Sequence, residues 1–127
     1  MNPAIQTLHS IASKPERLII GLMSGTSMDG LDIALCACTG SGAHTDLRIV
    51  NFKTIPYQED LRREIKSIFS KRDADLQKVC LLNELIGIRH AEMILQVLEE
   101  WNISPEGIDL IASHGQTIYH APRILHQ

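Results

Sequence analysis

The sequence has few aromatic side chains and no excess of basic charge. Phe, Trp and Tyr make up 4% of its 127 residues, and 12 Lys and Arg face 15 Asp and Glu, for a net charge of -3. Nucleic-acid bases stack on aromatic side chains, and phosphate backbones attract clustered Lys and Arg. The composition therefore argues against a nucleic-acid partner and against binding to an anionic membrane surface.

Cysteine is also scarce, and long hydrophobic runs are missing. Cys36, Cys38 and Cys80 form neither an even disulfide set nor a zinc-site spacing, which predicts small buried side chains in a reducing compartment. No apolar run approaches the ~20 residues of a membrane-spanning helix. The first 17 residues lack the basic and apolar regions of a secretory signal. We therefore expect a cytoplasmic protein with no membrane contact.

Hydrophobic residues make up 44% of the chain and charged residues 21%, which is typical of a globular domain. Short apolar segments bounded by turn residues predict four strands, and apolar residues at helical spacing predict two helices. The strands are expected at 17–23, 31–38, 47–57 and 108–113, and the helices within 58–73 and over 75–101. Residues 1–16 are expected to form an N-terminal extension, and residues 17–127 one α/β unit.

The order of these elements, β-β-β-α-α-β, predicts a mixed sheet. Short connections make the first three strands an antiparallel meander, and a helical crossover places the last strand parallel to the first. The apolar face of helix 75–101 is broad, so we expect this helix to be largely buried. Two polar segments, 25–30 and 113–116, then follow the carboxyl ends of strands that can be neighbours, where α/β proteins often place their sites.

The segment GLMSGTSMDGLDIAL at 21–35 carries the main functional signal. Backbone amides near glycines, with the hydroxyls of Ser24, Thr26 and Ser27, can surround a phosphate group. A carboxylate beside a phosphate requires a cation between them, so Asp29 predicts Mg²⁺, held directly or through water. Glycine and serine also dominate ordinary turns, so a purely structural turn remains the alternative from the pattern alone.

Common motifs do not match this segment. Gly25 and Gly30 have the spacing of a Walker A loop, but Leu31 and Asp32 stand where Lys and Ser or Thr are required. The glycines also do not fit G-x-G-x-x-G. The string GTSM is similar to the nucleophile loop of subtilisin-like proteases, but here the serine precedes His114 and leads into a strand, which argues against a serine hydrolase.

GLMSGTSMDGLDIAL together with ASHGQTIYHAP closely resembles the anhydro-N-acetylmuramic acid kinase family, from about Arg17 onward. The resemblance implies an incomplete first lobe of the ribonuclease H-like, actin-like ATPase fold. It implies a kinase of cell-wall recycling that uses ATP to phosphorylate 1,6-anhydro-N-acetylmuramic acid and opens the anhydro bridge with water. The phosphate loop is then 21–32, and His114 and Gln116 face the sugar or the transferred phosphate. The implied ATP-binding residues are Gly25, Thr26, Ser27, Met28, Asp29, Gly30, Leu31 and Asp32.

The resemblance also implies parts that this sequence does not contain. The family's general base is an aspartate in a later glycine-rich segment, and no stretch here matches it. We therefore expect an N-terminal piece of a kinase, inactive alone, whose complete form is a homodimer. The alternative is a stand-alone nucleotide- or sugar-binding module. Asp32 is expected either to support the loop or to be a polar residue satisfied within its strand.

Overall fold

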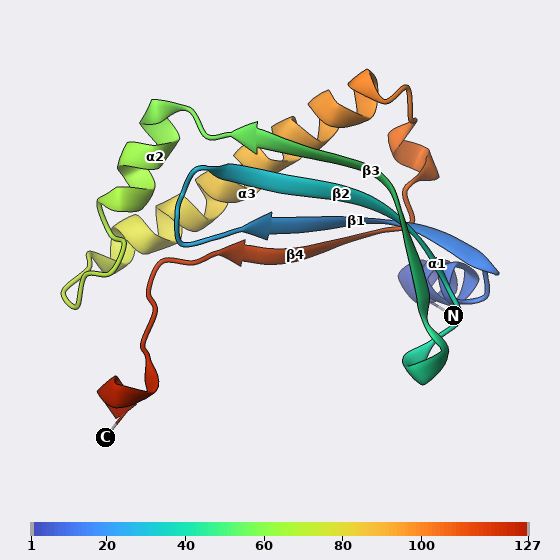
Figure 1. Ribbon diagram of the computed structural model, residues 1–127, viewed down its shortest axis with the longest axis horizontal. Coiled ribbons are helices and arrows are strands. Elements are labelled where there is room, and N and C mark those ends of the chain that lie inside the picture. The colour runs from blue at the N-terminus through green and yellow to red at the C-terminus, as the bar shows by residue number, and fades with distance from the viewer. Residues whose placement is uncertain (1, 127) are drawn as a thin grey trace.

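The computed structural model describes residues 2–126 and contains one mixed four-stranded sheet (Figure 1). The strands are β1 (Glu16–Ser24), β2 (Gly30–Thr39), β3 (Asp46–Pro56) and β4 (Leu110–Gln116). Their order in the sheet is β3-β2-β1-β4. The strand β2 pairs antiparallel with both β1 and β3, and β4 pairs parallel with β1. The predicted meander and the predicted parallel strand are both confirmed.

Three α-helices accompany the sheet in the described part of the chain. They are α1 (Pro3–Ala12), α2 (Glu59–Lys66) and α3 (Leu76–Glu100). Asp75 begins α3 by accepting a hydrogen bond from the backbone N–H of Lys78, as N-cap residues do. The helix α2 is shorter than the predicted segment because the chain turns after Lys66, and Ser70 adopts a positive φ of 55°.

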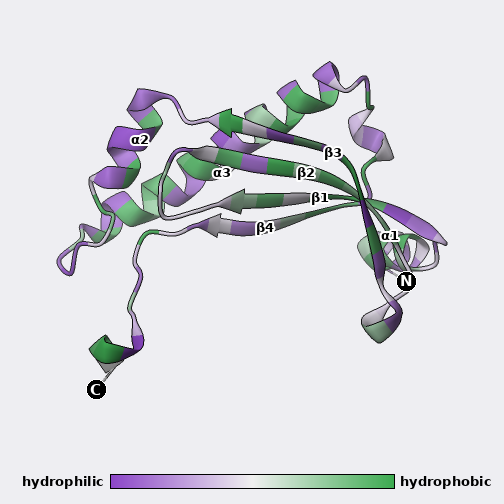
Figure 2. Cartoon of the chain, viewed as in Figure 1, coloured by the Kyte–Doolittle hydropathy of each residue, from purple (hydrophilic) through white to green (hydrophobic). Residues whose placement is uncertain are grey.

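The hydrophobic core lies between one face of the sheet and the helices α2 and α3. Alternate strand residues point into it, among them Ile20, Leu31 and Ile33, all at 0% exposure. From the helices, Ile65 and Val97 are equally buried. Figure 2 shows that hydrophobic residues alternate with polar ones along α3, so this helix offers one apolar side to the sheet.

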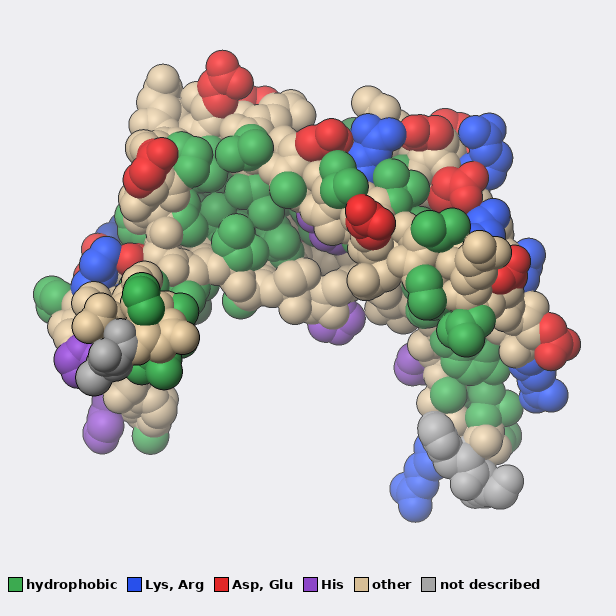
Figure 3. Space-filling view, turned by 180° about the vertical axis from the view of Figure 1, so that it is seen from behind, with side chains coloured by type: hydrophobic (Ala, Val, Ile, Leu, Met, Phe, Trp, Pro, Cys, Tyr) green, Lys and Arg blue, Asp and Glu red, His purple; other side chains and the backbone are tan. Residues whose placement is uncertain are grey.

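The predicted deep burial of α3 is wrong. Four of its large apolar side chains are at least half exposed, because only one side of the helix packs on the sheet: Leu76, Leu81, Ile88 and Leu95. Hydrophobic side chains gather on the surface seen in Figure 3. Leu95 and Ile111 lie at an apolar groove between α3 and the η2–β4 segment, where the 3-10 helix η2 spans Pro105–Gly107. The burial of the cysteines also needs correction, since Cys80 on α3 is exposed, whereas Cys36 and Cys38 are buried.

The N-terminal extension contains an exposed helix, and one of its residues forms an ion pair with the rest of the protein. No residue of α1 is buried. Beyond this helix, Lys14 forms an ion pair with Asp109, whose side chain is 7% exposed and also accepts the backbone N–H of Leu18. The ion pair fastens the extension to the start of β4. Among the described residues, no helix is both long and apolar enough to cross a membrane.

Candidate functional site

The two polar segments meet at the ends of β1 and β4. In the parallel pairing, Ser24 stands opposite Gln116, after a shift in register that follows Leu22. The Ser24 hydroxyl donates to the carbonyl of Gly115 at 3.0 Å, and Nε2 of Gln116 donates to the carbonyl of Gly25 at 3.1 Å. Segments separated by 91 residues are thereby joined at one sheet edge, where the strand order predicted that they would lie.

The turn between β1 and β2 separates exposed polar groups from buried apolar ones. Thr26, Ser27 and Asp29 are exposed, so their oxygens are available to a ligand. The expectation that Ser24 also offers its hydroxyl is wrong, because Ser24 is 1% exposed and donates to Gly115. Met28 and Leu31 point into the core, at 9% and 0% exposure. Within the predicted ATP-binding stretch, these two residues can therefore offer only their backbone groups to a ligand.

Gly30 allows the turn to approach β3 closely. A Cβ atom at this position would lie 2.3 Å from the carbonyl oxygen of Ile55, which is far inside contact distance. The backbone N–H of Tyr57 donates to the carbonyl of Asp29 at 2.9 Å and holds the same approach. The glycine thus allows β3 to support the turn that carries the exposed oxygens.

Asp32 lies on the opposite sheet face from the core and has a partner on the neighbouring strand. The hydroxyl of Thr54 donates to its Oδ1 at 2.5 Å, in the register that pairs Asp32 with Thr54. This contact agrees with the prediction of a polar residue satisfied within the sheet. Asp32 also lines a shallow hollow with Met23 and Phe52, which are about half exposed.

The structure places His114 and Gln116 in different surroundings. His114 is exposed, and its Nδ1 lies 3.3 Å from the carbonyl of Gly115, which has a φ of +76°. Gln116 is partly buried and lines a cavity of about 250 Å³ between α3 and the end of β4. His114 is not among the residues that line this cavity.

A buried chain of hydrogen bonds connects α3 to the polar loop, and the sequence analysis missed it. Nε2 of His90 lies 2.7 Å from the hydroxyl of Tyr57, and their rings stack with centroids 5.9 Å apart. The backbone N–H of Tyr57 in turn donates to the carbonyl of Asp29 in the polar turn at 2.9 Å. The available signal was the position of His90 on α3, four residues from both Ile86 and Ile94 on the apolar side of the helix.

Near this pair, the Ser24 hydroxyl donates to the carbonyl of Gly115. Which partner donates between His90 and Tyr57 is set by the tautomer of the imidazole ring. Burial lowers the pKa of His90, which favours its neutral form. Burial also raises the pKa of Tyr57, against the opposing effect of its hydrogen bond with Ser24. Both groups therefore stay uncharged near neutral pH, as the dry interior requires.

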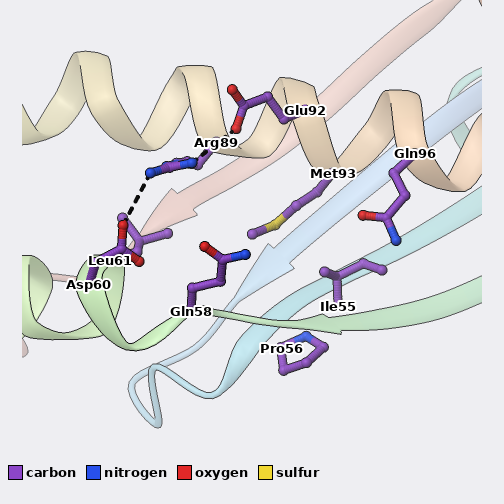
Figure 4. Close-up of a pocket in the computed structure, with 9 residues that line it drawn as sticks. All are labelled: Ile55, Pro56, Gln58, Asp60, Leu61, Arg89, Glu92, Met93 and Gln96. Atoms are coloured by element: carbon purple, nitrogen blue, oxygen red, sulfur yellow. Dashed lines mark hydrogen bonds and ion pairs between the residues drawn. The ribbon is translucent and has the colours of Figure 1, made fainter.

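A second pocket lies away from this edge of the sheet (Figure 4). It is formed by α3 together with the end of β3 and the start of α2, and Arg89 closes one side by pairing with Asp60 at 3.1 Å. Arg89 also pairs with Glu92 at 3.3 Å. Both carboxylates already have a cationic partner, and no residue of the polar loop or of β4 reaches this pocket.

Comparison with known proteins identifies the family. The family model described as anhydro-N-acetylmuramic acid kinase matches residues 17–127. The chain belongs to this family. The anhydro-N-acetylmuramic acid kinase of Pseudoalteromonas translucida is 50% identical over 127 residues, which are 100% of this chain and 32% of that protein. The anhydro-N-acetylmuramic acid kinase of Pseudoalteromonas atlantica is 54% identical over 122 residues, 96% of this chain and 30% of the relative.

The similarity extends to a relative of lower sequence identity. The enzyme of that name from Caldanaerobacter subterraneus subsp. tengcongensis is 42% identical over 115 residues, which are 91% of this chain and 29% of the relative. The chain therefore spans about a third of the length of these curated family members. The resemblance drawn from the two polar segments is confirmed, and so is the fold class, an α/β unit compatible with an incomplete first lobe.

Proposed function

We propose that this chain is the N-terminal part of an anhydro-N-acetylmuramic acid kinase and supplies its phosphate loop and part of its sugar site. The complete enzyme uses ATP to phosphorylate 1,6-anhydro-N-acetylmuramic acid with hydrolytic opening of the ring, giving N-acetylmuramic acid 6-phosphate. One observation carries the proposal: in a chain of this family, the two polar segments are hydrogen-bonded together at the ends of adjacent parallel strands.

In this proposal the loop binds phosphate with its backbone and its hydroxyls. The amides near Gly25 and Gly30 donate to the β- and γ-phosphate oxygens, and the hydroxyls of Thr26 and Ser27 add two further donors. Phosphoryl transfer depends mainly on positioning and on neutralising charge, and a loop held against the sheet suits both. His114 is exposed beside the loop, where it can donate to a bound phosphate or sugar oxygen.

The residues present fit a magnesium ion held mainly by phosphate and water. Among residues 2–126, no three His, Cys, Asp or Glu side chains are grouped so that they could hold a metal ion. Magnesium usually keeps several waters and takes one or two carboxylates plus phosphates, so the exposed Asp29 suffices. The ion would neutralise phosphate charge, and Asp29 would orient its water ligands.

The general base is proposed to lie in the part of the kinase that this chain does not span. The bridge oxygen takes the phosphoryl group while water adds at the other end of the broken bridge, so the proton that needs an acceptor is that of the water, and an aspartate in the later glycine-rich segment is the expected base. Residues 1–127 alone should therefore show no sugar-dependent release of ADP. Measurable release by the purified chain would contradict this division of roles.

A stand-alone binding module is the alternative function. Such a module should have a polar surface wherever no second lobe covers it. The exposed apolar side chains of α3 and the apolar groove beside β4 argue against this alternative. They favour a chain that is covered by further protein.

The test is a titration of the isotope-labelled chain with Mg-ATP, followed by nuclear magnetic resonance. We expect weak binding that shifts the amide signals of residues 25–30, and its loss in the double variant Thr26→Ala, Ser27→Ala. Ser41→Ala, in the exposed turn after β2, is the matched control and should bind as the parent does. Shifts confined to other regions, or an unchanged affinity in the double variant, would refute the phosphate loop.

A further inference from the structure

The polar turn between β1 and β2 contains a residue other than glycine in a left-handed backbone conformation. Met28 has a φ of 55°, whereas neither Gly25 nor Gly30 is among the residues of positive φ. For a residue with a Cβ atom this conformation is sterically costly, and it persists only where the surrounding structure imposes it. Glycine adopts it freely, so the use of methionine at this position points to a role for its side chain.

The side chain of Met28 is fixed in the hydrophobic core. It is 9% exposed and belongs to the same cluster of buried side chains as Leu31 and Tyr57. The residues on either side of it, Ser27 and Asp29, are exposed. The buried side chain therefore anchors the turn from the side of the core and leaves the polar groups next to it facing solvent. A glycine could adopt the same φ, but it would have no side chain to serve as this anchor.

The chain directly after Met28 is held from β3. The backbone N–H of Tyr57 donates to the carbonyl of Asp29 at 2.9 Å, and the hydroxyl of Tyr57 lies 2.7 Å from Nε2 of His90 on α3. Tyr57 and His90 are both buried. The left-handed residue and the residue after it are thus both fixed to buried groups. The fold itself therefore imposes the conformation of this part of the turn, without help from a ligand.

We propose that Met28 is a positioning residue of the phosphate loop, whose buried side chain holds the left-handed turn ready for the phosphates of Mg-ATP. A turn with a left-handed residue can direct successive backbone N–H groups to one side, where they form a nest for an anion. Because folding has already ordered the turn, little conformational entropy is lost when ATP binds, and the affinity for ATP is higher. The inference rests on the proposed function, which makes segment 25–30 the phosphate loop.

Leucine and isoleucine at position 28 separate this role from simple packing. Their side chains have the same atoms, but branching at Cβ makes isoleucine far less tolerant of a positive φ. In a complete kinase that contains this segment, Met28→Leu should keep the KM for Mg-ATP within about twofold of the parent, since volume and flexibility at Cβ are conserved. Met28→Ile should raise this KM about tenfold, because the loop must then be ordered on binding, and should change the KM for the sugar less than about twofold. Met23→Ile is the control, since Met23 lies in β1 and is 48% exposed, and it should keep both KM values.

Equal KM values for Mg-ATP in Met28→Leu and Met28→Ile would show that Met28 only fills space, and would overturn the inference. If Met28→Ile does not fold, Met28→Gly decides, because glycine adopts the turn without strain but lacks the anchor. A raised KM for Mg-ATP in this variant supports the inference, and the parent value overturns it. A parent kinase without ATP-dependent phosphorylation of the sugar refutes the proposed function and this inference together, whereas an active parent with unchanged KM values in every variant refutes the inference alone.

Discussion

The hydroxyl of Tyr57 lies 2.7 Å from Nε2 of His90, and both side chains are at most 6% exposed. Tyr57 follows β3 directly, and its backbone N–H holds the carbonyl of Asp29 in the polar turn. One buried pair thus joins α3 to the polar turn, and changes in it should be felt at the candidate site.

Tyr57→Phe should destabilise the protein although it removes a single oxygen atom. The variant leaves the buried Nε2 of His90 without its hydrogen-bond partner, at a cost of about 1–3 kcal/mol in the free energy of unfolding. Urea denaturation followed by circular dichroism measures this cost. Tyr119→Phe is the control, because Tyr119 is 43% exposed and its replacement should change the free energy of unfolding little. Equal losses in the two variants would show that the buried chain of hydrogen bonds does not contribute to stability.

His90 should make stability fall on mild acidification. Burial lowers its pKa below the ordinary 6.5, so below pH 6.5 the unfolded chain binds a proton that the folded protein does not. The contribution of the neutral His90 to the free energy of unfolding is therefore fully present above pH 6.5. It declines as the pH falls from 6.5 towards the lower pKa that His90 has in the folded protein. His90→Gln should flatten the free energy of unfolding in this window, whereas replacement of the exposed His44 by Gln should not. An unchanged slope in His90→Gln would contradict the assignment.

Gly30→Ala should strain the polar turn. The new Cβ would lie 2.3 Å from a backbone oxygen of β3, which cannot move aside as the end of a flexible side chain could. Overpacking of this kind costs about 1–3 kcal/mol, and thermal unfolding should show a lowered midpoint. Gly107→Ala, where no atom lies within 4 Å of the new Cβ, should leave the midpoint nearly unchanged. A Gly30→Ala variant as stable as the parent would mean that β3 and the turn are less closely packed than described.

Asp109 should support the N-terminal extension above strongly acidic pH. Hydrogen bonds from Lys14, and then from the backbone N–H of Leu18, lower the pKa of this carboxyl below its ordinary 3.8. Its contribution to stability is therefore present above 3.8 and is lost as the pH falls through the lower folded value. Asp109→Asn should remove this part of the acid transition and increase proteolysis after Ala12. The exposed Asp73→Asn should change neither measurement.

Much of the sheet could be predicted because its determinants are local. The apolar runs at 17–23 and 31–38 are joined by a short turn, so they pair antiparallel, and the helical crossover before 108–113 requires a parallel strand. The period of the apolar residues likewise located α3 to within one residue at either end. The amino-acid strings of the two polar segments were specific enough to indicate the family, which the family match confirms.

The tertiary structure decided which side chains are buried and which side chains contact each other. The broad apolar face of α3 predicted a buried helix, but only one sheet face is available to cover it, so Leu95 stays exposed. No local pattern predicts the hydrogen bond between Tyr57 and His90, which lie 33 residues apart, because that contact depends on how α3 packs on the sheet. The sequence by itself determined the strands, their order and the polar loop. The packing of α3 on the sheet decided which polar groups are buried together, because burial depends on residues that are distant along the chain.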